Sequence, residues 1–370
     1  MKNKDFFFVK MFACIPPPYG GLCVYVKRLS LALTQKGYVS GAFYHDSIVG
    51  IPSEYNHLYD LMPKHARSFY VLFELFRLLP IFKRYKIVHS HLNLGTCLSM
   101  WMVRNLLSKP IVLTIHNQMI DRELHDLNFI DRKCLESLFR DEFVQVITVN
   151  DNGKKFLKSK GFIFANDIKV LPAYIAPVEI GKTADYLSEE LIRFIDTHPR
   201  FIVFYAESFA YYGEKEIYGT RECLIAFSHL TKEFSDLALV FCMPNVNNDE
   251  ALLQLKEIVK ENGCSDKVYW QLSGIPEMWP LLKHSALYLR PTSTDGDSVL
   301  LREALGLGVP SLASDVVSRP ATCELYHYGN QEDMESKMKI MLHGNKKTVS
   351  SNKDFFNEMF SIYKELLEKH

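Results

Sequence analysis

The stretch "RPTSTDGDSVLLREALGLGVPSLAS", residues 290–314, combines an acidic, glycine-containing loop with a short apolar helix and an apolar strand. Asp297 or Ser298 is a credible helix N-cap, because each offers a side-chain oxygen to the backbone N–H groups of the first turn. The positive end of the helix dipole would then face the loop. This arrangement predicts a site for an anion.

Two carboxylates in this stretch lie eight residues apart, Asp295 in the loop and Glu303 about two turns into the helix. Acids near a helix start are often only partners of the helix dipole. For the loop acid, the structural and the functional interpretations therefore stay open. Glu303 is surrounded by apolar sequence, and a buried carboxylate needs a partner. From these positions both carboxylates can face one bound molecule.

Two other features could carry chemistry elsewhere in the chain. Gly20 and Gly21, in "PPPYGG", stand between an apolar run and a helical pattern, where backbone N–H groups can approach a ligand. His116 ends the apolar run "PIVLTIH", and a histidine there can hydrogen-bond a sugar hydroxyl or a phosphate. Each also has a structural interpretation, as turn glycines or a capped histidine. His89 and His91 are interpreted as structural, with side chains on opposite faces of a strand.

The composition is that of an ordinary globular protein. The chain has 370 residues, of which 48% are hydrophobic, enough for two domains with full cores. Lys and Arg together number 43, as do Asp and Glu, so no global charge attracts nucleic acid. The 8 cysteines have no metal-ligand spacing, and no apolar run reaches the roughly 18 residues that span a bilayer. We therefore expect a cytoplasmic protein without nucleic-acid partners.

Short apolar runs alternate with helical patterns, which predicts a parallel α/β sheet in each half of the chain. The first half begins with a strand, not a signal peptide, and a polar stretch of low order around residues 176–200 separates it from the second. The last helical pattern has no strand after it and is free to pack back on the first half. No dinucleotide-binding or P-loop glycine motif follows a strand. Helices are expected near residues 21–35, 69–83, 97–107, 221–233 and 249–262.

Taken together, "PPPYGG", "KIVHSH", "PIVLTIH", "IKVLPAYI" and the 290–314 stretch resemble the retaining, nucleotide-sugar-dependent glycosyltransferases of family 4. The most specific element is the pair Asp295 and Glu303, separated by seven residues and followed by "EALGLG" and "GVP". The resemblance implies the GT-B fold, with two Rossmann-like, doubly wound α/β domains facing an interdomain cleft. The acceptor-binding domain would comprise residues 1–175 with a returning helix at 352–370, and the donor-binding domain residues 176–351.

The resemblance also implies roles for individual residues. Glu303 would bind the donor ribose, Asp295 would contact the transferred sugar, and His116 would lie at that sugar, so these three are the candidate catalytic residues. The donor diphosphate would lie on the backbone at the helix start, approached by the glycines of the other domain. The further donor-binding residues implied are Gly20, Gly21, Gly296, Asp297, Ser298, Val299 and Leu300.

The sequence departs from the family pattern in its positive charges. Where the family has an Arg and a Lys, "FYAESF" offers Glu207 and "EIYGTRE" offers Tyr218. A departing nucleoside diphosphate needs a positive group to offset its charge. Arg290 is the first candidate for this donor-binding cation and Lys215 the second, with Arg221 as a further choice. No metal or other cofactor is expected, since no Asp-x-Asp motif lies between the two domains and Asp295 of "DGD" is assigned to the sugar.

The resemblance implies a retaining hexosyltransferase that moves a sugar from a nucleotide-diphosphate sugar to an acceptor glycan, as in bacterial O-antigen or capsule synthesis. Two alternatives stay open, a sugar-nucleotide epimerase of the same shape and a pseudoenzyme that binds the donor without turnover. A lipid-linked acceptor would bring the protein to the inner face of the cell membrane. The run at residues 70–86 could rest on an anionic surface, although a core helix is the favoured interpretation.

Overall fold

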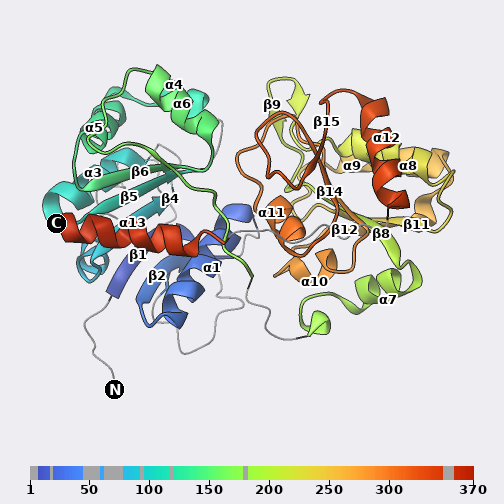
Figure 1. The fold of residues 1–370 in the computed structure, drawn as a ribbon, viewed down its shortest axis with the longest axis horizontal. Helices are drawn as coiled ribbons and strands as arrows, with labels where there is room; N and C mark the ends of the chain where they lie inside the picture. Colours follow the sequence, from blue (N-terminus) through green and yellow to red (C-terminus); the bar gives the residue numbers. More distant parts are fainter. Residues whose placement is uncertain are drawn as a thin grey trace. The chain divides into compact units, whose positions relative to one another are not determined.

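A computed structural model describes residues 7–16, 20–44, 59–61, 78–91, 96–116, 120–177, 182–344 and 354–370. The chain divides into two units, each with its own sheet and core. Unit 1 contains residues 1–175 and 354–370, and unit 2 contains residues 176–353. The division falls where the strand-and-helix pattern of the sequence restarts. Figure 1 shows the elements of each unit, coloured from blue at the N-terminus to red at the C-terminus.

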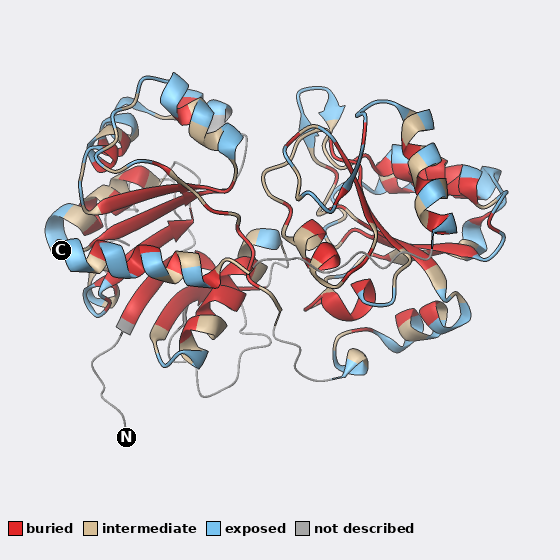
Figure 2. Cartoon of the chain, viewed as in Figure 1, coloured by how far each residue is buried: buried red, intermediate tan, exposed pale blue. Residues whose placement is uncertain are grey.

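Unit 1 is built on a sheet whose described strands are all parallel, in the order β3-β2-β1-β4-β5-β6-β7. The strands are continuous apolar runs because helices cover both faces of the sheet. Figure 2 shows the buried strands of this sheet, of which β4, β5 and β6 are buried along their length. The described strands are β1 (Phe7–Cys14), β2 (Val39–Tyr44), β3 (Tyr59–Leu61), β4 (Ile87–His91), β5 (Ile111–Ile115), β6 (Val144–Thr148) and β7 (Lys169–Val170).

Lys10 is a charged exception in the middle of β1. It is fully buried, its Nζ donates to the carbonyl of Ala42 at 2.9 Å, and it pairs with Asp60 of β3. Burial lowers the pKa of Lys10 to about 8, against the opposing attraction of Asp60. This ion pair ties the edge strand β3 to the centre of the sheet.

Helices pack on both faces of this sheet and form two apolar cores. Helices α1 and α13 share one core with β1, and helices α3, α5 and α6 share the other. Side-chain caps begin two of them, because Asn128 accepts the N–H of Asp131 and Asn150 accepts that of Gly153. The described helices are α1 (Gly21–Gln35), α3 (Cys97–Leu107), α4 (Ile120–Asp126), α5 (Phe129–Phe139), α6 (Asp151–Ser159) and α13 (Phe356–Lys369).

The C-terminal helix α13 belongs to unit 1 although the whole of unit 2 precedes it in the chain. Its buried side chains recur every three or four residues, which gives one apolar face toward the core. Figure 2 shows the alternating buried and exposed stripes along this helix. The expectation that this helix packs back on the first domain is confirmed. The buried residues are Phe356, Met359, Ile362, Tyr363 and Leu366.

Unit 2 has a second sheet, in the order β12-β11-β8-β13-β14-β15, and its described strands are again parallel. A short antiparallel pair, β9 (Tyr211–Tyr212) and β10 (Lys215–Glu216), follows β8. Both sheets thus have the doubly wound order that the sequence pattern predicts. The strands of the large sheet are β8 (Arg200–Tyr205), β11 (Leu237–Cys242), β12 (Val268–Gln271), β13 (Leu287–Arg290), β14 (Ser311–Ser314) and β15 (Glu324–Tyr326).

The helices of unit 2 also cover both faces of its sheet. Helices α8, α9 and α12 pack on one face and α7, α10 and α11 on the other. Two 3-10 turns, η3 (Thr183–Asp185) and η4 (Ser265–Lys267), complete the unit. The helices are α7 (Glu189–Thr197), α8 (Thr220–Leu230), α9 (Asp249–Glu261), α10 (Trp279–Leu282), α11 (Val299–Gly306) and α12 (Gln331–His343).

The structure corrects the expectation for residues 176–200 and describes only part of the run at residues 70–86. Residues 176–200 were expected to have low order, but α7 lies there, capped by Ser188 and anchored by the buried Leu191 and Ile195. Its i,i+4 apolar pair was hidden among charged residues. Of the run at residues 70–86, the first eight lie outside the described residues. No helix in the described ranges has the length and hydrophobicity needed to cross a membrane.

Candidate functional site

The two sheets each contain one point where the strand order reverses. Open parallel sheets bind ligands there, beyond the carboxyl ends of the strands. The reversal lies between β1 and β4 in unit 1 and between β8 and β13 in unit 2. The predicted residues follow these strands: Gly20 and Gly21 come after β1, His116 comes directly after β5, and residues 290–303 run from β13 into α11. Each reversal is therefore a candidate site in its own unit.

The carboxylate of Asp295 lies between two arginines in the loop after β13. Arg290 donates from Nε to Oδ2 at 3.0 Å and from Nη2 to Oδ1 at 3.2 Å. Arg319 donates from Nη1 to Oδ2 at 2.7 Å, and the backbone N–H of Gly296 donates to Oδ1 at 3.0 Å. These four bonds use the four lone-pair positions of a carboxylate. A direct contact between Asp295 and a sugar therefore requires one of them to break.

The three charges of this group, called here the Asp295 cluster (Arg290, Asp295 and Arg319), are held away from water. The side chain of Asp295 is 9% exposed and that of Arg319 is 2% exposed. Burial would raise the pKa of Asp295, but the two guanidinium groups outweigh it and hold this pKa well below its usual range. The cluster carries one positive charge in excess. Sequence reasoning missed Arg319, because its pairing spans 24 residues and leaves no local pattern.

Helix α11 begins immediately after this loop. Ser298 is its N-cap, and the Oγ of Ser298 accepts the N–H of Leu301 at 3.2 Å. The cap is one of the two that the sequence allows. The predicted donor-binding residues Val299 and Leu300 form the first turn and are half-buried. The loop therefore delivers the chain to the positive end of a helix dipole at the carboxyl end of β13.

Two more carboxylates accompany this helix start. Asp297 accepts two bonds from Nε of Arg302, to Oδ1 at 2.7 Å and to Oδ2 at 2.8 Å. Glu303 lies in the second turn of α11 and is 1% exposed. The sequence predicts a buried position for Glu303, and this burial is confirmed.

The segment after β8 carries a carboxylate where the family pattern has a cation. The hydroxyl of Tyr205 donates to Oε2 of Glu207 at 2.5 Å, and Nδ2 of Asn245 donates to Oε1. Lys215, the second candidate cation, is exposed on β10, with Nζ 5.8 Å from the ring centroid of Tyr328. No hydrogen bond or ion pair within the described residues joins Lys215 to the loop after β13.

Gly219 lets the loop after β13 approach the start of α8 closely. Its φ of 69° lies in the left-handed region, and a Cβ there would come within 2.4 Å of the carbonyl oxygen of Pro291. The N–H of Ser293 also donates to the carbonyl of Ile217 at 2.8 Å. These contacts position the loop that carries Asp295. Sequence reasoning did not single out Gly219, although a glycine before a helix was visible.

Three histidines gather at the carboxyl ends of β4 and β5 in unit 1. The rings of His89 and His91 pack against each other, tilted by 33° with centroids 3.8 Å apart, and Nδ1 of His91 lies 3.0 Å from Nε2 of His116. The ring of Tyr25, from the second turn of α1, contacts both His91 and His116 edge-on, at centroid distances of 5.6 and 5.8 Å. His116 is thus brought beside the helix that begins at the predicted Gly20 and Gly21.

The expectation that His89 and His91 face opposite sides of their strand is wrong. Side chains alternate along a strand, so residues two positions apart share a face. Burial lowers the pKa of His116 to about 4 and the pKa values of His89 and His91 well below the ordinary value. The three imidazoles are therefore neutral at pH 7. In the described ranges, no group of three or more His, Cys, Asp or Glu residues is arranged to hold a metal ion.

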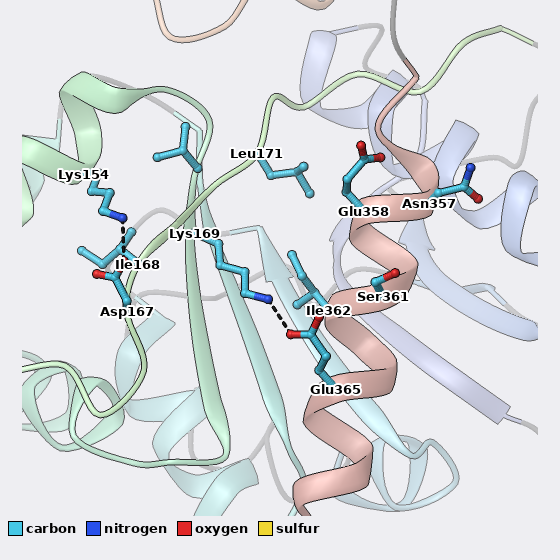
Figure 3. Close-up of a pocket in the computed structure, with 11 residues that line it drawn as sticks. Lys154, Asp167, Ile168, Lys169, Leu171, Asn357, Glu358, Ser361, Ile362 and Glu365 are labelled. Atoms are coloured by element: carbon cyan, nitrogen blue, oxygen red, sulfur yellow. Dashed lines mark hydrogen bonds and ion pairs between the residues drawn. The ribbon is translucent and has the colours of Figure 1, made fainter.

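A surface groove of about 580 Å³ lies along α13, lined also by residues of α6 and β7. Figure 3 shows Lys154 and Lys169 directed at carboxylates, in ion pairs with Asp167 at 2.8 Å and with Glu365 at 2.5 Å. These lysines are occupied by neighbouring acids. The groove is also beside the edge strand β7 and not at the reversal between β1 and β4. We assign it no ligand.

Comparison with known proteins gives one family match and several structural likenesses. Residues 19–176 match the sequence model of Glycosyltransferase Family 4, and no curated protein matches the chain. A glycosyltransferase from Rickettsia africae is 13% identical, with a TM-score of 0.74 over 98% of this chain and 99% of its own. HepE of Anabaena, in complex with UDP and glucose, is 12% identical, with a TM-score of 0.65 over 98% of each chain. A Listeria monocytogenes protein proposed as a UDP-N-acetylglucosamine 2-epimerase is 15% identical, with a TM-score of 0.62 over 99% of this chain and 98% of its own.

At such identities the likeness to solved structures establishes the fold. It agrees with the two doubly wound sheets and with the C-terminal helix that belongs to unit 1. The family match falls on unit 1 and contains three of the runs on which the resemblance was based, "KIVHSH", "PIVLTIH" and "IKVLPAYI". The resemblance is thereby confirmed. The chain has the GT-B fold, and residues 19–176 match Glycosyltransferase Family 4.

Proposed function

We propose that the chain is a glycosyltransferase that moves a sugar from a nucleotide-diphosphate sugar to an acceptor glycan, with retention of anomeric configuration. The family match and the GT-B fold support this proposal, as do the UDP and glucose bound to HepE. The observation that carries it is the position of Glu303. This buried carboxylate lies in the second turn of a helix whose capped start follows β13, at the strand reversal of unit 2.

In this proposal the nucleotide part of the donor binds to unit 2. Glu303 accepts hydrogen bonds from the ribose hydroxyls, and the backbone of residues 296–300 holds the diphosphate at the positive end of the helix dipole. The excess positive charge of the Asp295 cluster offsets the charge of the leaving nucleoside diphosphate. Asp295 then acts by holding Arg290 and Arg319, in place of the direct sugar contact that the resemblance implies. Activity needs no metal.

In the same proposal, unit 1 binds the transferred sugar and the acceptor. His116 is a neutral hydrogen-bonding group for the transferred sugar, and the backbone at Gly20 and Gly21 approaches the same ligand without side chains in the way. The acceptor is a glycan or lipid-linked glycan of a bacterial surface polysaccharide, such as O-antigen or capsule. A lipid-linked acceptor implies work in the cytoplasm at the inner face of the cell membrane.

A panel of nucleotide sugars tested by thermal unfolding checks the proposal, beginning with UDP-glucose. A donor at 100 times its dissociation constant stabilises the folded state by about 2.7 kcal/mol. The donor that stabilises the protein is then offered with glycan acceptors in excess EDTA, and the anomeric configuration of the product is determined by NMR. Folded protein that is stabilised by no nucleotide sugar would contradict donor binding, and loss of turnover in EDTA would contradict metal independence.

One observation favours a second candidate, a protein that binds a nucleotide sugar without transferring it. The carboxylate of Glu207 stands after β8, where the family pattern has a cation, and it repels a diphosphate. The likeness to the proposed epimerase also keeps epimerisation of the donor open. Product analysis separates the three outcomes: transferase activity needs acceptor, epimerase activity changes the donor alone, and a binding protein changes neither.

A further inference from the structure

His91 has one ring nitrogen with a partner and one without. Its Nδ1 lies 3.0 Å from Nε2 of His116, whereas its Nε2 is buried and accepts or donates no hydrogen bond to the described residues. The ring is held in place, because the tilted ring of His89 packs against it at 3.8 Å and Tyr25 packs against it edge-on at 5.6 Å between centroids. The position of the proton on each ring therefore depends on which of the two histidines donates the hydrogen bond between them.

Two proton arrangements are compatible with this bond between neutral imidazoles. If His116 donates from Nε2, His91 accepts at Nδ1 and carries its own proton on Nε2, which leaves a buried N–H without an acceptor. If His91 donates from Nδ1, its buried Nε2 is a lone pair. An orphaned buried N–H is rarer and costlier than an unused acceptor. The second arrangement is therefore the stable one, and it puts the proton of His116 on Nδ1.

We propose that His91 is a positioning residue that fixes the tautomer of His116, so that His116 offers a protonated Nδ1 to a ligand. Nδ1 of His116 makes no hydrogen bond to any residue that the structure describes, and His116 is only half-buried. A neutral N–H in this position selects a hydrogen-bond acceptor such as a sugar hydroxyl oxygen. The identity of that acceptor rests on the proposed function, whereas the tautomer does not.

The same geometry gives the C-terminal helix α13 a part in the site. Nδ1 of His89 lies 2.6 Å from the hydroxyl of Tyr363 on α13, and Nε2 of His89 lies 2.7 Å from Oγ1 of Thr114 on β5. Both ring nitrogens of His89 are thus bonded, and these bonds fix the orientation of the ring against which His91 packs. Tyr363 holds His89, His89 supports His91, and His91 orients His116.

The tautomer of His116 is measured by NMR on protein labelled with ¹⁵N in its histidines, through the couplings of ring nitrogens to carbon-bound protons. The signals of His116 are those missing from His116→Gln. The expected result in the unsubstituted protein at pH 7 is a protonated Nδ1 and an unprotonated Nε2. A protonated Nε2 would overturn the proposal directly, whether or not any variant folds.

Two substitutions at His91 then separate positioning from packing. His91→Leu fills the space of the ring with an apolar side chain but removes the hydrogen-bond donor. We therefore expect the tautomer ratio of His116 to shift about tenfold toward a protonated Nε2. His91→Asn places an amide N–H near the position of Nδ1 and should restore the original tautomer. His125→Leu, a change at an exposed histidine, should leave it unchanged.

An unchanged tautomer in His91→Leu, or a failure of His91→Asn to restore it, would refute the positioning role. These readings need no donor and no turnover. A protein that shows the expected tautomer but binds no nucleotide sugar would leave the role of His91 standing and reject the proposed function. The two failures are therefore distinguishable.

Discussion

The carboxyl ends of the two sheets are built from opposite chemistry. In unit 1 the residues around His116 are aromatic and neutral, because burial lowers the pKa values of the imidazoles. In unit 2 the loop after β13 keeps its charges when buried, because each carboxylate is matched by at least one guanidinium at 2.7–3.2 Å. Burial removes charge in one unit, and ion pairing preserves charge in the other.

This difference suggests a division of labour within the proposed reaction. A neutral, polar pocket suits hydroxyl groups, which exchange hydrogen bonds without bringing charge. A cluster with excess positive charge at a helix start suits phosphates. The same difference sets what each unit is sensitive to: unit 1 to pH, through protonation of histidines, and unit 2 to loss of a single charge.

The largest effect is expected from Asp295→Asn, which leaves Arg290 and Arg319 buried without their carboxylate. Breaking a buried ion pair in this way costs about 3–5 kcal/mol. Urea unfolding of unit 2 measures it. Asp297→Asn is the matched control, since the carboxylate of Asp297 also pairs with a guanidinium, that of Arg302, in the same loop and helix start. Equal costs for the two substitutions would show that the double pairing does not set the stability of this loop.

Acidification is expected to weaken unit 1 next. The folded-state pKa of His116 is about 4 and its ordinary value is 6.5, so the unfolded chain binds a proton over this range while the folded chain does not. The stability is thus fully present above pH 6.5 and is lost as the pH falls toward 4, by about 1.4 kcal/mol per pH unit for each such histidine. For His116 alone, the loss reaches about 3 kcal/mol at pH 4.

Unfolding free energies of the unsubstituted protein and His116→Gln, measured from pH 4 to pH 7, test this prediction. The difference in slope isolates His116 from the neighbouring groups His89, His91, Tyr25 and Tyr363, which face it in both proteins. Parallel pH profiles would mean that His116 is not held neutral by burial, and the contrast between the two units would be lost.

Glu303→Gln sharpens the comparison from the side of unit 2. A charged hydrogen bond to the ribose hydroxyls would be lost, which is worth about 1.5–3 kcal/mol, or tenfold or more in donor affinity. Calorimetry with the donor found in the nucleotide-sugar panel measures the change. His116→Gln is the matched variant in unit 1, expected to lower turnover more than donor affinity. Unchanged donor affinity in Glu303→Gln would remove Glu303 from the nucleotide site.

Much of the fold was predictable because it depends on local periodicity. Residues 21–35 and 97–107 form helices with the expected bounds, and the strands β8, β11 and β13 fall on the expected apolar runs. The helix at Glu189–Thr197 was missed because only two of its positions are buried, too few for a visible pattern. Periodicity reports a segment only when enough of it faces the core.

The candidate site was predictable in place but not in its pairings. Loop, cap and acid could be read from residues 290–303, because caps and strand ends are local features. The enclosure of Asp295 by Arg290 and Arg319 could not be predicted, since Arg290 ends β13 whereas Arg319 follows β14, 24 residues beyond Asp295. That His89 and His91 share a face of β4 follows from the strand period, and the sequence interpretation applied that period wrongly.

The smallest effect concerns the two helix starts. Ser298 caps α11 with its side chain, whereas Gly20 begins α1 without a side-chain cap and with an ordinary φ of −76°. Ser298→Ala should therefore destabilise unit 2 by about 1 kcal/mol, through the lost bond to Leu301. Gly20→Ala removes no bond and needs no strained backbone, so its cost should stay within about 0.5 kcal/mol. Paired urea unfolding curves compare them. Equal unfolding costs for the two substitutions would show that the side-chain cap of Ser298 does not stabilise the start of α11.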